Sequence, residues 1–316
     1  MSTSQTPPVP VGRTARRLEW AHLPPHVRTL VERECGAPVV DAISQGGGFT
    51  PGFASVLVGA DGRRHFVKAA SAKAQRAVAH SYREEARRLA ALPTGAPAPR
   101  LLWQHDRDDW VVLGIEYVDS SAPRRPWRLP EVEASARMLE RLAEALTPVP
   151  ASLSLDPVAD ELADWPRAWD HVRATRPDLP HLDEAAGLAA GFAAVTAGDT
   201  LVHTDVRDDN LLLTADGRVL LCDWNWPAVG AAWLDTVLLL LGPRGDGLDV
   251  DALLTRLPLT RDVPAESIDT FLALVTGYFW RQGDERVPPT SPYLRDFQRW
   301  QGDVAWAWLA ERRGWA

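Results

Sequence analysis

The chain has 316 residues, of which 46% are hydrophobic and 24% are charged, and this composition predicts a globular protein of about two domains. Disordered, collagen-like and coiled-coil proteins are excluded. Two cysteines, Cys35 and Cys222, are too few for a disulfide framework, which indicates a reducing compartment. The sequence shows neither the apolar stretch of a signal peptide nor the roughly 20 apolar residues that span a bilayer. We therefore expect a cytoplasmic protein with no membrane partner.

The net charge of −8 is unevenly distributed along the chain. Residues 1–118 hold 15 basic and 11 acidic side chains, whereas residues 119–316 hold 19 basic and 31 acidic ones. This asymmetry favours a first half that accommodates an anion and a second half that attracts a cation, although a solvated acidic surface would give the same counts. The larger half has no basic stripe, so nucleic acid is not an expected partner.

The amino-terminal part predicts a leader followed by a small sheet. Residues 1–14 are polar and rich in proline, which is typical of a disordered segment. Short apolar runs around glycine turns then predict a mostly antiparallel sheet with one inserted helix over 72–92. In one of these strands, alternation places Lys68 on the face opposite Val67. We assign residues 15–118 to this sheet lobe, the first of two.

From residue 119 onward the sequence becomes mainly helical. Trp300, Val304 and Trp308 follow helical spacing, which favours packing inside the lobe over a membrane face. A sheet lobe followed by a larger helical lobe, residues 119–316, is an α+β two-lobed architecture. The segments with helical periodicity are 130–147, 160–175, 183–197, 231–241 and 265–281.

The most informative polar residues lie between residues 201 and 227. A predicted hairpin brings the loop 203–210 beside Asp223, so that Asp205, Asn210 and Asp223 converge. Two carboxylates and an amide at a strand end can hold Mg²⁺ and leave one aspartate free as a base. A surface loop with acidic turn residues is the alternative interpretation of the same pattern.

Two residue types are used so rarely that each use is informative. Lys68 and Lys73 are the only lysines among 34 basic residues, and Asn210 and Asn225 are the only asparagines. A lysine ammonium is a compact point charge, and an asparagine oxygen is a neutral ligand. Where arginine serves almost everywhere else, a retained lysine indicates a chemical role.

The combined motifs resemble the aminoglycoside phosphotransferase family, which has a protein-kinase-like fold. HTDVRDDN at 203–210 is similar to the catalytic loop His-x-Asp-x4-Asn of that family. The other resembling segments are the metal-aspartate motif DW at 223–224, the helix WLDTVLLL at 233–240, the nucleotide-positioning loop GGGFTPG at 46–52 and the adenine-holding hinge IEYVDS at 115–120. The resemblance extends over roughly residues 43–240.

The resemblance implies a role for each matching residue of the helical lobe. Asp205 would orient the attacking hydroxyl and accept its proton. Asn210 and Asp223 would bind Mg²⁺ that bridges the nucleotide phosphates. His203 and Asp235 would brace the catalytic loop.

On the nucleotide side, the resemblance implies that Lys68 contacts the phosphates of ATP or GTP. A helix carboxylate would hold this lysine, and the family spacing implies Glu85, with Glu84 as the alternative. Thr50 would offer its hydroxyl and backbone amide to the phosphates. The hinge residues expected to bind the nucleotide are Glu116 and Val118.

Two positions depart from the family pattern. Thr204 stands where the family usually has glycine, and a β-branched residue predicts an extended backbone there. Asn225 stands where an acidic residue is common, which predicts a weaker second metal site or a contact with the substrate.

Asp235 follows Asp223 by only 12 positions, which is too short for the platform that binds a peptide, so we expect a small-molecule acceptor. The acidic helical lobe favours a cationic acceptor, namely an aminoglycoside or related antibiotic, and hence a role in antibiotic resistance. A metabolic or biosynthetic kinase for choline, homoserine, an amino sugar or a nucleoside-like compound is the alternative, and an inactive kinase-like binding module is a third. Candidate acceptor contacts are Asp160, Asp164, Asp208, Trp224, Asn225 and Trp226.

Overall fold

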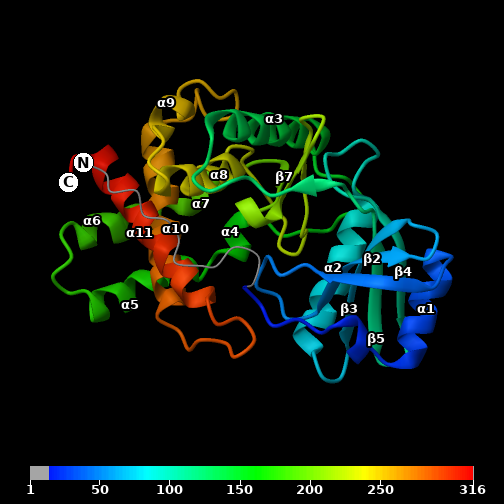
Figure 1. Ribbon diagram of the computed structural model, residues 1–316. Helices are drawn as coiled ribbons and strands as arrows, with labels where there is room; N and C mark the ends of the chain where they lie inside the picture. The colour runs from blue at the N-terminus through cyan, green and yellow to red at the C-terminus, as the bar shows by residue number, and fades with distance from the viewer. Residues whose placement is uncertain (1–13, 316) are drawn as a thin grey trace.

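A five-stranded antiparallel sheet organises the first of two lobes, drawn in blue to teal in Figure 1. The structure is a computed structural model that describes residues 14–315, so the leader expected over 1–14 lies outside it except for Thr14. The strand order is β1-β2-β3-β5-β4. These strands are β1 (Val39–Ser44), β2 (Phe53–Gly59), β3 (Arg64–Ser71), β4 (Leu101–Arg107) and β5 (Trp110–Ile115).

One helix covers each face of this sheet. Helix α1 (Pro25–Cys35) buries Val27 and Val31 against one face, where they join Val67 of β3 in a small apolar cluster. Helix α2 (Arg76–Ala91) packs on the other face. Because successive side chains of a strand point to opposite faces, Lys68 lies under α2 when Val67 lies under α1. The alternation predicted for this strand is confirmed.

The second lobe is mainly helical, and α10 and α11 form its central pair (Figure 1). Trp300, Val304 and Trp308 of α11 are buried in the core of the lobe, so the packing predicted for them is confirmed. The helices are α3 (Leu129–Ala145), α4 (Val158–Glu161), α5 (Ala168–Thr175), α6 (Leu182–Ala190), α7 (Phe192–Thr196), α8 (Leu234–Gly245), α9 (Val250–Leu254), α10 (Ala265–Gly283) and α11 (Leu294–Arg313).

Two helices predicted as continuous are interrupted. The segment 160–175 is divided into α4, a 3-10 turn (Trp165–Arg167) and α5. Pro166 has no N–H to continue an α-helix, which accounts for the break. The segment 183–197 is divided at Gly191 into α6 and α7.

Five short strands of the second lobe carry the loops of interest. β8 (Leu211–Thr214) and β9 (Val219–Leu221) form a hairpin, and β6 (Ser120–Ser121) pairs with β8. β7 (Thr200–Val202) pairs with β10 (Ala228–Gly230). Between β5 and β6 the chain therefore passes from the sheet lobe to the hairpin. Among the described residues, none of the helices combines the length and apolar character of a membrane crossing.

Candidate active site

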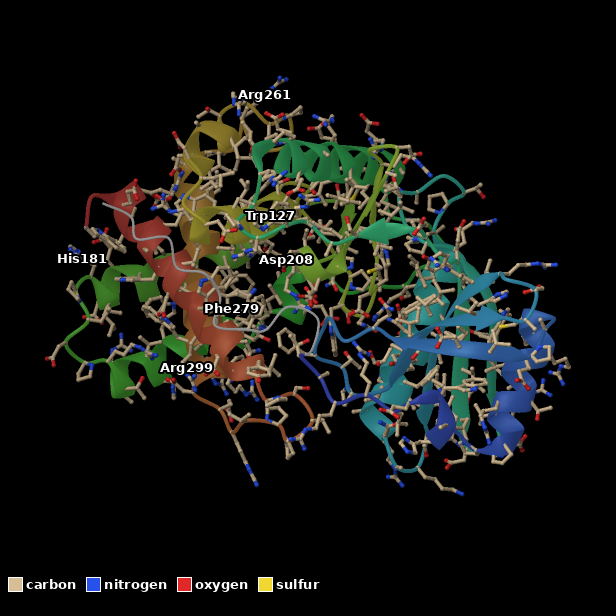
Figure 2. The ribbon with its side chains drawn as sticks, viewed as in Figure 1. Trp127, His181, Asp208, Arg261, Phe279 and Arg299 are labelled. Atoms are coloured by element: carbon tan, nitrogen blue, oxygen red, sulfur yellow. The ribbon has the colours of Figure 1, made fainter. Side chains whose placement is uncertain are left out.

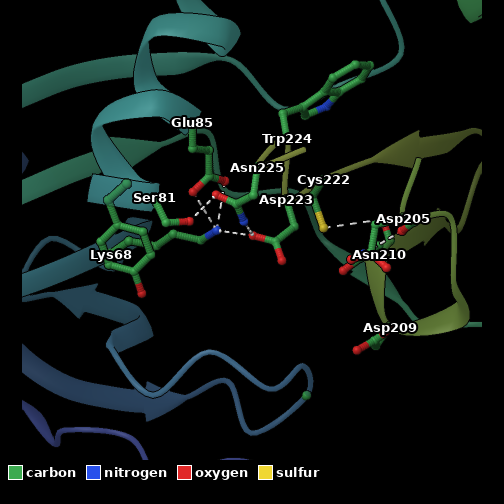
Figure 3. Close-up of polar contacts among 12 residues, drawn as sticks. Lys68, Ser81, Glu85, Asp205, Asp209, Asn210, Cys222, Asp223, Trp224 and Asn225 are labelled. Atoms are coloured by element: carbon green, nitrogen blue, oxygen red, sulfur yellow. Dashed lines mark hydrogen bonds and ion pairs between the residues drawn. The ribbon is translucent and has the colours of Figure 1, made fainter. Parts of the chain in front are cut away.

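Lys68 is held between one carboxylate from each lobe (Figure 3). Its Nζ lies 2.7 and 2.8 Å from the two carboxylate oxygens of Glu85 and 2.8 Å from Oδ1 of Asp223. Glu84, the alternative partner, instead bonds Arg87 on the surface of α2. Glu85 is 1% exposed and Lys68 8% exposed, so this ion pair is shielded from solvent. Glu85, and not Glu84, is therefore the helix carboxylate that holds Lys68.

The charges of this cluster stabilise one another. Burial alone would lower the pKa of Lys68, but the carboxylates of Asp223 and Glu85 outweigh it and raise that pKa above its ordinary value. Burial likewise acts to raise the pKa of Asp223, and the Lys68 ammonium overcomes it, lowering that pKa to about 2. Both groups are therefore charged at neutral pH.

The loop after β7 is anchored by Asp235 at the start of α8. Asp235 accepts hydrogen bonds from the backbone N–H groups of His203 (2.7 Å) and Thr204 (2.9 Å). The His203 ring contacts the carbonyl oxygen of Cys222 through Nε2 at 3.0 Å. Burial lowers the pKa of His203, which favours the neutral ring. His203 thus connects the loop to the end of β9.

Thr204 corrects an expectation from the sequence. Its φ is 64°, in the left-handed region, and not extended as its β-branched side chain predicts. Two hydrogen bonds of Thr204 hold this conformation. Its backbone N–H donates to Oδ1 of Asp235 at 2.9 Å, and its hydroxyl donates to the carbonyl oxygen of Trp226 at 2.6 Å. Glycine at this position would adopt the same φ without steric cost, which explains the family preference.

We expect Thr204→Val to destabilise the protein more than Thr204→Gly does, although valine is the closer isostere. Valine loses the hydroxyl bond to Trp226 and keeps the left-handed strain, whereas glycine loses the bond but removes strain of about 1–3 kcal/mol. The entropic cost of glycine, roughly 0.5–1 kcal/mol, offsets only part of that gain. Urea unfolding of both variants checks this order, and a more stable valine variant would contradict it.

Asp205 and Asn210 are joined within the loop. The Asn210 side-chain Nδ2 donates to the backbone oxygen of Asp205 at 2.8 Å and to its Oδ2 at 3.2 Å. Burial raises the pKa of Asp205 to about 6, although Arg207 acts in the opposite direction. Asn210 also connects to β9, since its carbonyl oxygen accepts from the N–H of Cys222 at 3.0 Å. The loop and Asp223 therefore lie on adjoining strand ends.

Arg207 is a site residue that the sequence analysis did not single out. It contacts Oδ1 of Asp205 at 3.1 Å and Oδ1 of Asp209 at 2.9 Å. Its guanidinium also lies 5.5 Å from the ring centre of Phe49, in the glycine turn, and 5.8 Å from that of Phe297, on α11. The sequence contains one signal for this role, because Arg207 is the only arginine or lysine in the acidic loop HTDVRDDN.

The glycine turn lies between the beginning of the described chain and the helical lobe. Thr14 donates from its N–H to the carbonyl oxygen of Gly46 at 2.9 Å, and Arg17 donates through Nη2 to that of Gly47 at 2.7 Å. Gly48 has a φ of 75°, which glycine adopts without strain. Thr50, at the end of this turn, makes no hydrogen bond within the described residues.

The segment between the lobes leaves two backbone groups available. The N–H of Glu116 donates to the carbonyl oxygen of Arg100 at 2.8 Å, and the carbonyl oxygen of Val118 accepts from Ser120 at 3.1 Å. Over residues 14–315, neither the carbonyl oxygen of Glu116 nor the N–H of Val118 makes a hydrogen bond. The segment therefore presents one acceptor and, two residues later, one donor. The Glu116 side chain is directed elsewhere and pairs with Arg100 at 3.0 Å.

The sequence matches the model of a phosphotransferase enzyme family, APH, over residues 49–266. The chain belongs to this family. No curated protein matches the sequence.

Solved structures show that this family member has the kinase-like fold expected from the sequence. An aminoglycoside phosphotransferase from Alicyclobacillus acidocaldarius is 17% identical, with a TM-score of 0.55 over 93% of this chain and 96% of that one. A choline kinase, LicA, from Streptococcus pneumoniae is 13% identical, with a TM-score of 0.59 over 90% of this chain and 99% of that one. A structure of LicA in complex with AMP is also 13% identical, with a TM-score of 0.52 over 92% and 100%.

A cavity of about 410 Å³ opens beside Asp205 in the helical lobe of the phosphotransferase. Trp226, one of the predicted acceptor contacts, lines it and is 66% exposed. Trp165 also lines it and stacks on Tyr278, with ring centres 3.5 Å apart and planes at 4°. Trp165 is not among the acceptor contacts expected from the sequence.

The other predicted acceptor contacts lie outside the cavity. Trp224 is 1% exposed, packs edge-on against His203 at 4.9 Å and points away from the Lys68 cluster (Figure 3). Asp208 lies near the junction of the lobes (Figure 2) and pairs with Arg125 at 3.3 Å. Asp160 and Asp164 are exposed and do not line the cavity. They lie in and just beyond α4, because the helix expected to present them is interrupted.

Asn225 is buried and does not line the cavity. Its Nδ2 donates to Oδ1 of Asp223 at 2.6 Å, and its Oδ1 accepts from the hydroxyl of Ser81 on α2 at 2.7 Å. Arg88 of α2 also donates to the Asn225 carbonyl oxygen. Asn225 therefore ties Asp223 to the helix that carries Glu85. This correction could not be read from the sequence, because Ser81 is 144 residues away.

Proposed function

We propose that the protein transfers the γ-phosphate of a nucleoside triphosphate, most simply ATP, to a hydroxyl of a small molecule, with Mg²⁺ as the metal. The observation that carries this proposal is the contact of Lys68 with both Glu85 and Asp223, beside the loop of Asp205 and Asn210. Phosphoryl transfer depends on positioning and on neutralising charge, and this arrangement supplies both.

The side chains fit a magnesium ion that takes most of its ligands from phosphates and water. Oδ1 of Asp223 already accepts from Lys68 and Asn225, which directs its Oδ2 to a metal. Asn210 uses its Nδ2 on Asp205, which leaves its Oδ1 as a second ligand. Over residues 14–315 no three His, Cys, Asp or Glu side chains form a metal cage. Magnesium is commonly held through one or two carboxylates and the substrate phosphates, whose charge it neutralises.

Asp205 is the proposed base. With a pKa of about 6 it is ionised at neutral pH yet basic enough to attract the proton of an attacking alcohol. Its bond to Asn210 fixes the carboxylate in the loop. Arg207, paired with Asp205, places a permanent positive charge beside the transferred phosphoryl group.

The nucleotide would lie between the glycine turn and the inter-lobe segment. The free carbonyl oxygen of Glu116 and the free N–H of Val118 match the amino group and the ring nitrogen of adenine, which favours ATP over GTP. The AMP bound to the LicA structure supports use of an adenine nucleotide by this fold. Thr50 and Lys68 are proposed phosphate contacts.

For the acceptor, an aminoglycoside or related antibiotic, with a role in resistance, remains a hypothesis drawn from the acidic helical lobe. The positions of Asp160 and Asp164 outside the cavity do not support it. A metabolic kinase for choline, homoserine, an amino sugar or a nucleoside-like alcohol is the second candidate, supported by the similarity to the choline kinase fold. An inactive module is disfavoured, because the lysine, the base and both metal ligands are assembled.

The test is release of ADP by the purified chain with ATP and a panel of alcohols. We expect release that requires Mg²⁺, stops with a chelator and is stimulated by a suitable acceptor. Glu85→Gln should lower the rate of ADP release. Glu84→Gln, which changes the neighbouring glutamate at the surface, should not. Absence of both nucleotide binding and ADP release in the folded protein would contradict the proposal.

We also expect Ser81→Ala to lower turnover by up to about tenfold. The variant removes the bond that fixes Asn225, and a neutral hydrogen bond contributes about 0.5–1.5 kcal/mol. Because Asn225 orients Asp223, the Mg²⁺ concentration for half-maximal activity should rise in parallel. Ser135→Ala is the matched control, since Ser135 is a buried serine bonded only within α3. Equal effects of the two variants on activity would mean that Ser81 stabilises the fold and does not position Asp223.

A further inference from the structure

The cavity beside Asp205 has walls that are mainly apolar, built from aromatic and aliphatic side chains. The stacked pair of Trp165 and Tyr278 belongs to this lining, and the other aromatic residues are Trp226, Phe271, Phe279 and Phe297. The aliphatic part of the lining consists of Leu, Val and Ala side chains from α4 and the residue after it, β10, α8, α10 and α11. At about 410 Å³ the cavity is within the range that holds drug-sized ligands.

The charged groups of the lining are few. They are Glu161, Asp205 and Arg207, and the last two pair with each other at 3.1 Å. Glu161 is therefore the one carboxylate of the lining that is not paired within the cavity. A polycation would bring several ammonium groups against aromatic and aliphatic walls, and each unpaired ion costs several kcal/mol to desolvate. A single ammonium could use Glu161 and the aromatic faces.

One amide of this lining makes no hydrogen bond within the protein's described residues. Gln301 of α11 is 7% exposed, lines the cavity, and its side chain makes no hydrogen bond within the described residues. Its neighbour Gln298, which also lines the cavity, is engaged by Arg295 at 2.8 Å. Its amide is therefore available to hydrogen-bond a polar group of a ligand in the cavity.

From this lining we infer that the acceptor is a predominantly apolar, ring-containing alcohol with at most one positive charge. This inference rests on the proposed phosphotransferase function. Rings would lie on the faces of Trp165 and Trp226, a polar substituent would bond Gln301, and a hydroxyl would reach Asp205 at the mouth of the cavity. The acidic surface of the helical lobe then serves solvation and does not select the acceptor.

The test compares four probes by calorimetry and by Mg²⁺-dependent ADP release: 1-naphthaleneethanol, which is neutral and aromatic, propranolol, which has one ammonium and an aromatic ring, choline and kanamycin. We expect the two naphthyl alcohols to bind at least about tenfold more tightly than choline or kanamycin. Binding of 1-naphthaleneethanol should not change between 0.05 and 0.5 M NaCl, because no ion pair holds it.

A matched pair of variants distinguishes loss of a contact in the cavity from a general effect on folding. Trp165→Ala should weaken binding of both naphthyl alcohols by about thirtyfold, the effect of removing a central aromatic contact. Trp315→Ala should leave it unchanged, since Trp315 is likewise stacked on a ring, that of His181, but lies outside the cavity. Equal affinities for the two variants would overturn the assignment.

The two proposals fail in different ways. Tighter binding and faster ADP release with kanamycin than with any naphthyl alcohol would overturn the apolar acceptor and leave the phosphotransferase function intact. Failure of both naphthyl alcohols to bind would also overturn it. Tight binding of these alcohols to a protein that neither binds ATP nor releases ADP would support the cavity assignment and overturn the proposed function.

Discussion

Asp205→Asn should lower turnover at least about a hundredfold, the usual scale of acid–base help, while the affinity for nucleotide stays unchanged. The amide keeps the size of the carboxylate and can keep the contact with Asn210, but it cannot accept a proton. Nucleotide affinity should persist because the proposed nucleotide contacts, Lys68 and the backbone of Glu116 and Val118, lie in other segments.

Single-turnover kinetics and nucleotide titration separate these two effects. Asp216→Asn is a suitable control, because Asp216 lies in the exposed turn of the β8–β9 hairpin and bonds only to Thr214 and Arg218. It changes a carboxylate nearby in sequence without touching the loop. Near-normal turnover of a folded Asp205→Asn protein would remove Asp205 as the base.

Lys68→Arg should lower nucleotide binding or turnover by about ten- to hundredfold, although arginine serves at almost every other basic position. Lys68 directs one compact ammonium at Glu85 and Asp223, with contacts of 2.7 and 2.8 Å. A planar guanidinium is larger and cannot occupy that point. Loss of one hydrogen bond to a charged group costs about 1.5–3 kcal/mol, which corresponds to this range of activity.

Lys73→Arg provides the internal comparison. Lys73 is exposed and makes no hydrogen bond within residues 14–315, so a guanidinium should be tolerated there. Kinetic constants for ATP and melting temperatures of both variants decide the matter. If the two variants behave alike, the scarcity of lysine carries no functional information.

The parts of the site that local patterns specify were predictable from the sequence. Alternation within β3 places Lys68 under α2. The family spacing implies Glu85 as its partner, but the local pattern of α2 does not decide between Glu85 and Glu84. The hairpin of β8 and β9 brings the end of the loop beside Asp223. The placements of Lys68 and of the loop depend on residues close in sequence, where strand and helix periods are decisive.

The parts that depend on distant partners were not predictable. Asp223 has a φ of 67°, and this left-handed turn accompanies a buried Trp224 and an Asn225 that faces Ser81. Neither the turn nor the partner on α2 has a local signal. The carboxylates around α4 looked like one acidic face because the sequence suggested a continuous helix, and its interruption leaves Asp160 and Asp164 outside the cavity.

The stack of Phe49, Arg207 and Phe297 has a thermodynamic consequence for the order of binding. Phe49 belongs to the glycine turn, whereas Arg207 and Phe297 line the cavity, so one contact joins the proposed nucleotide and acceptor positions. A movement of the turn on nucleotide binding would shift the wall of the proposed acceptor cavity. Linkage is reciprocal, so an acceptor that tightens nucleotide binding by some factor is itself bound more tightly by the same factor. The affinities for the two substrates would then be coupled through Arg207, even though the substrates do not contact each other there.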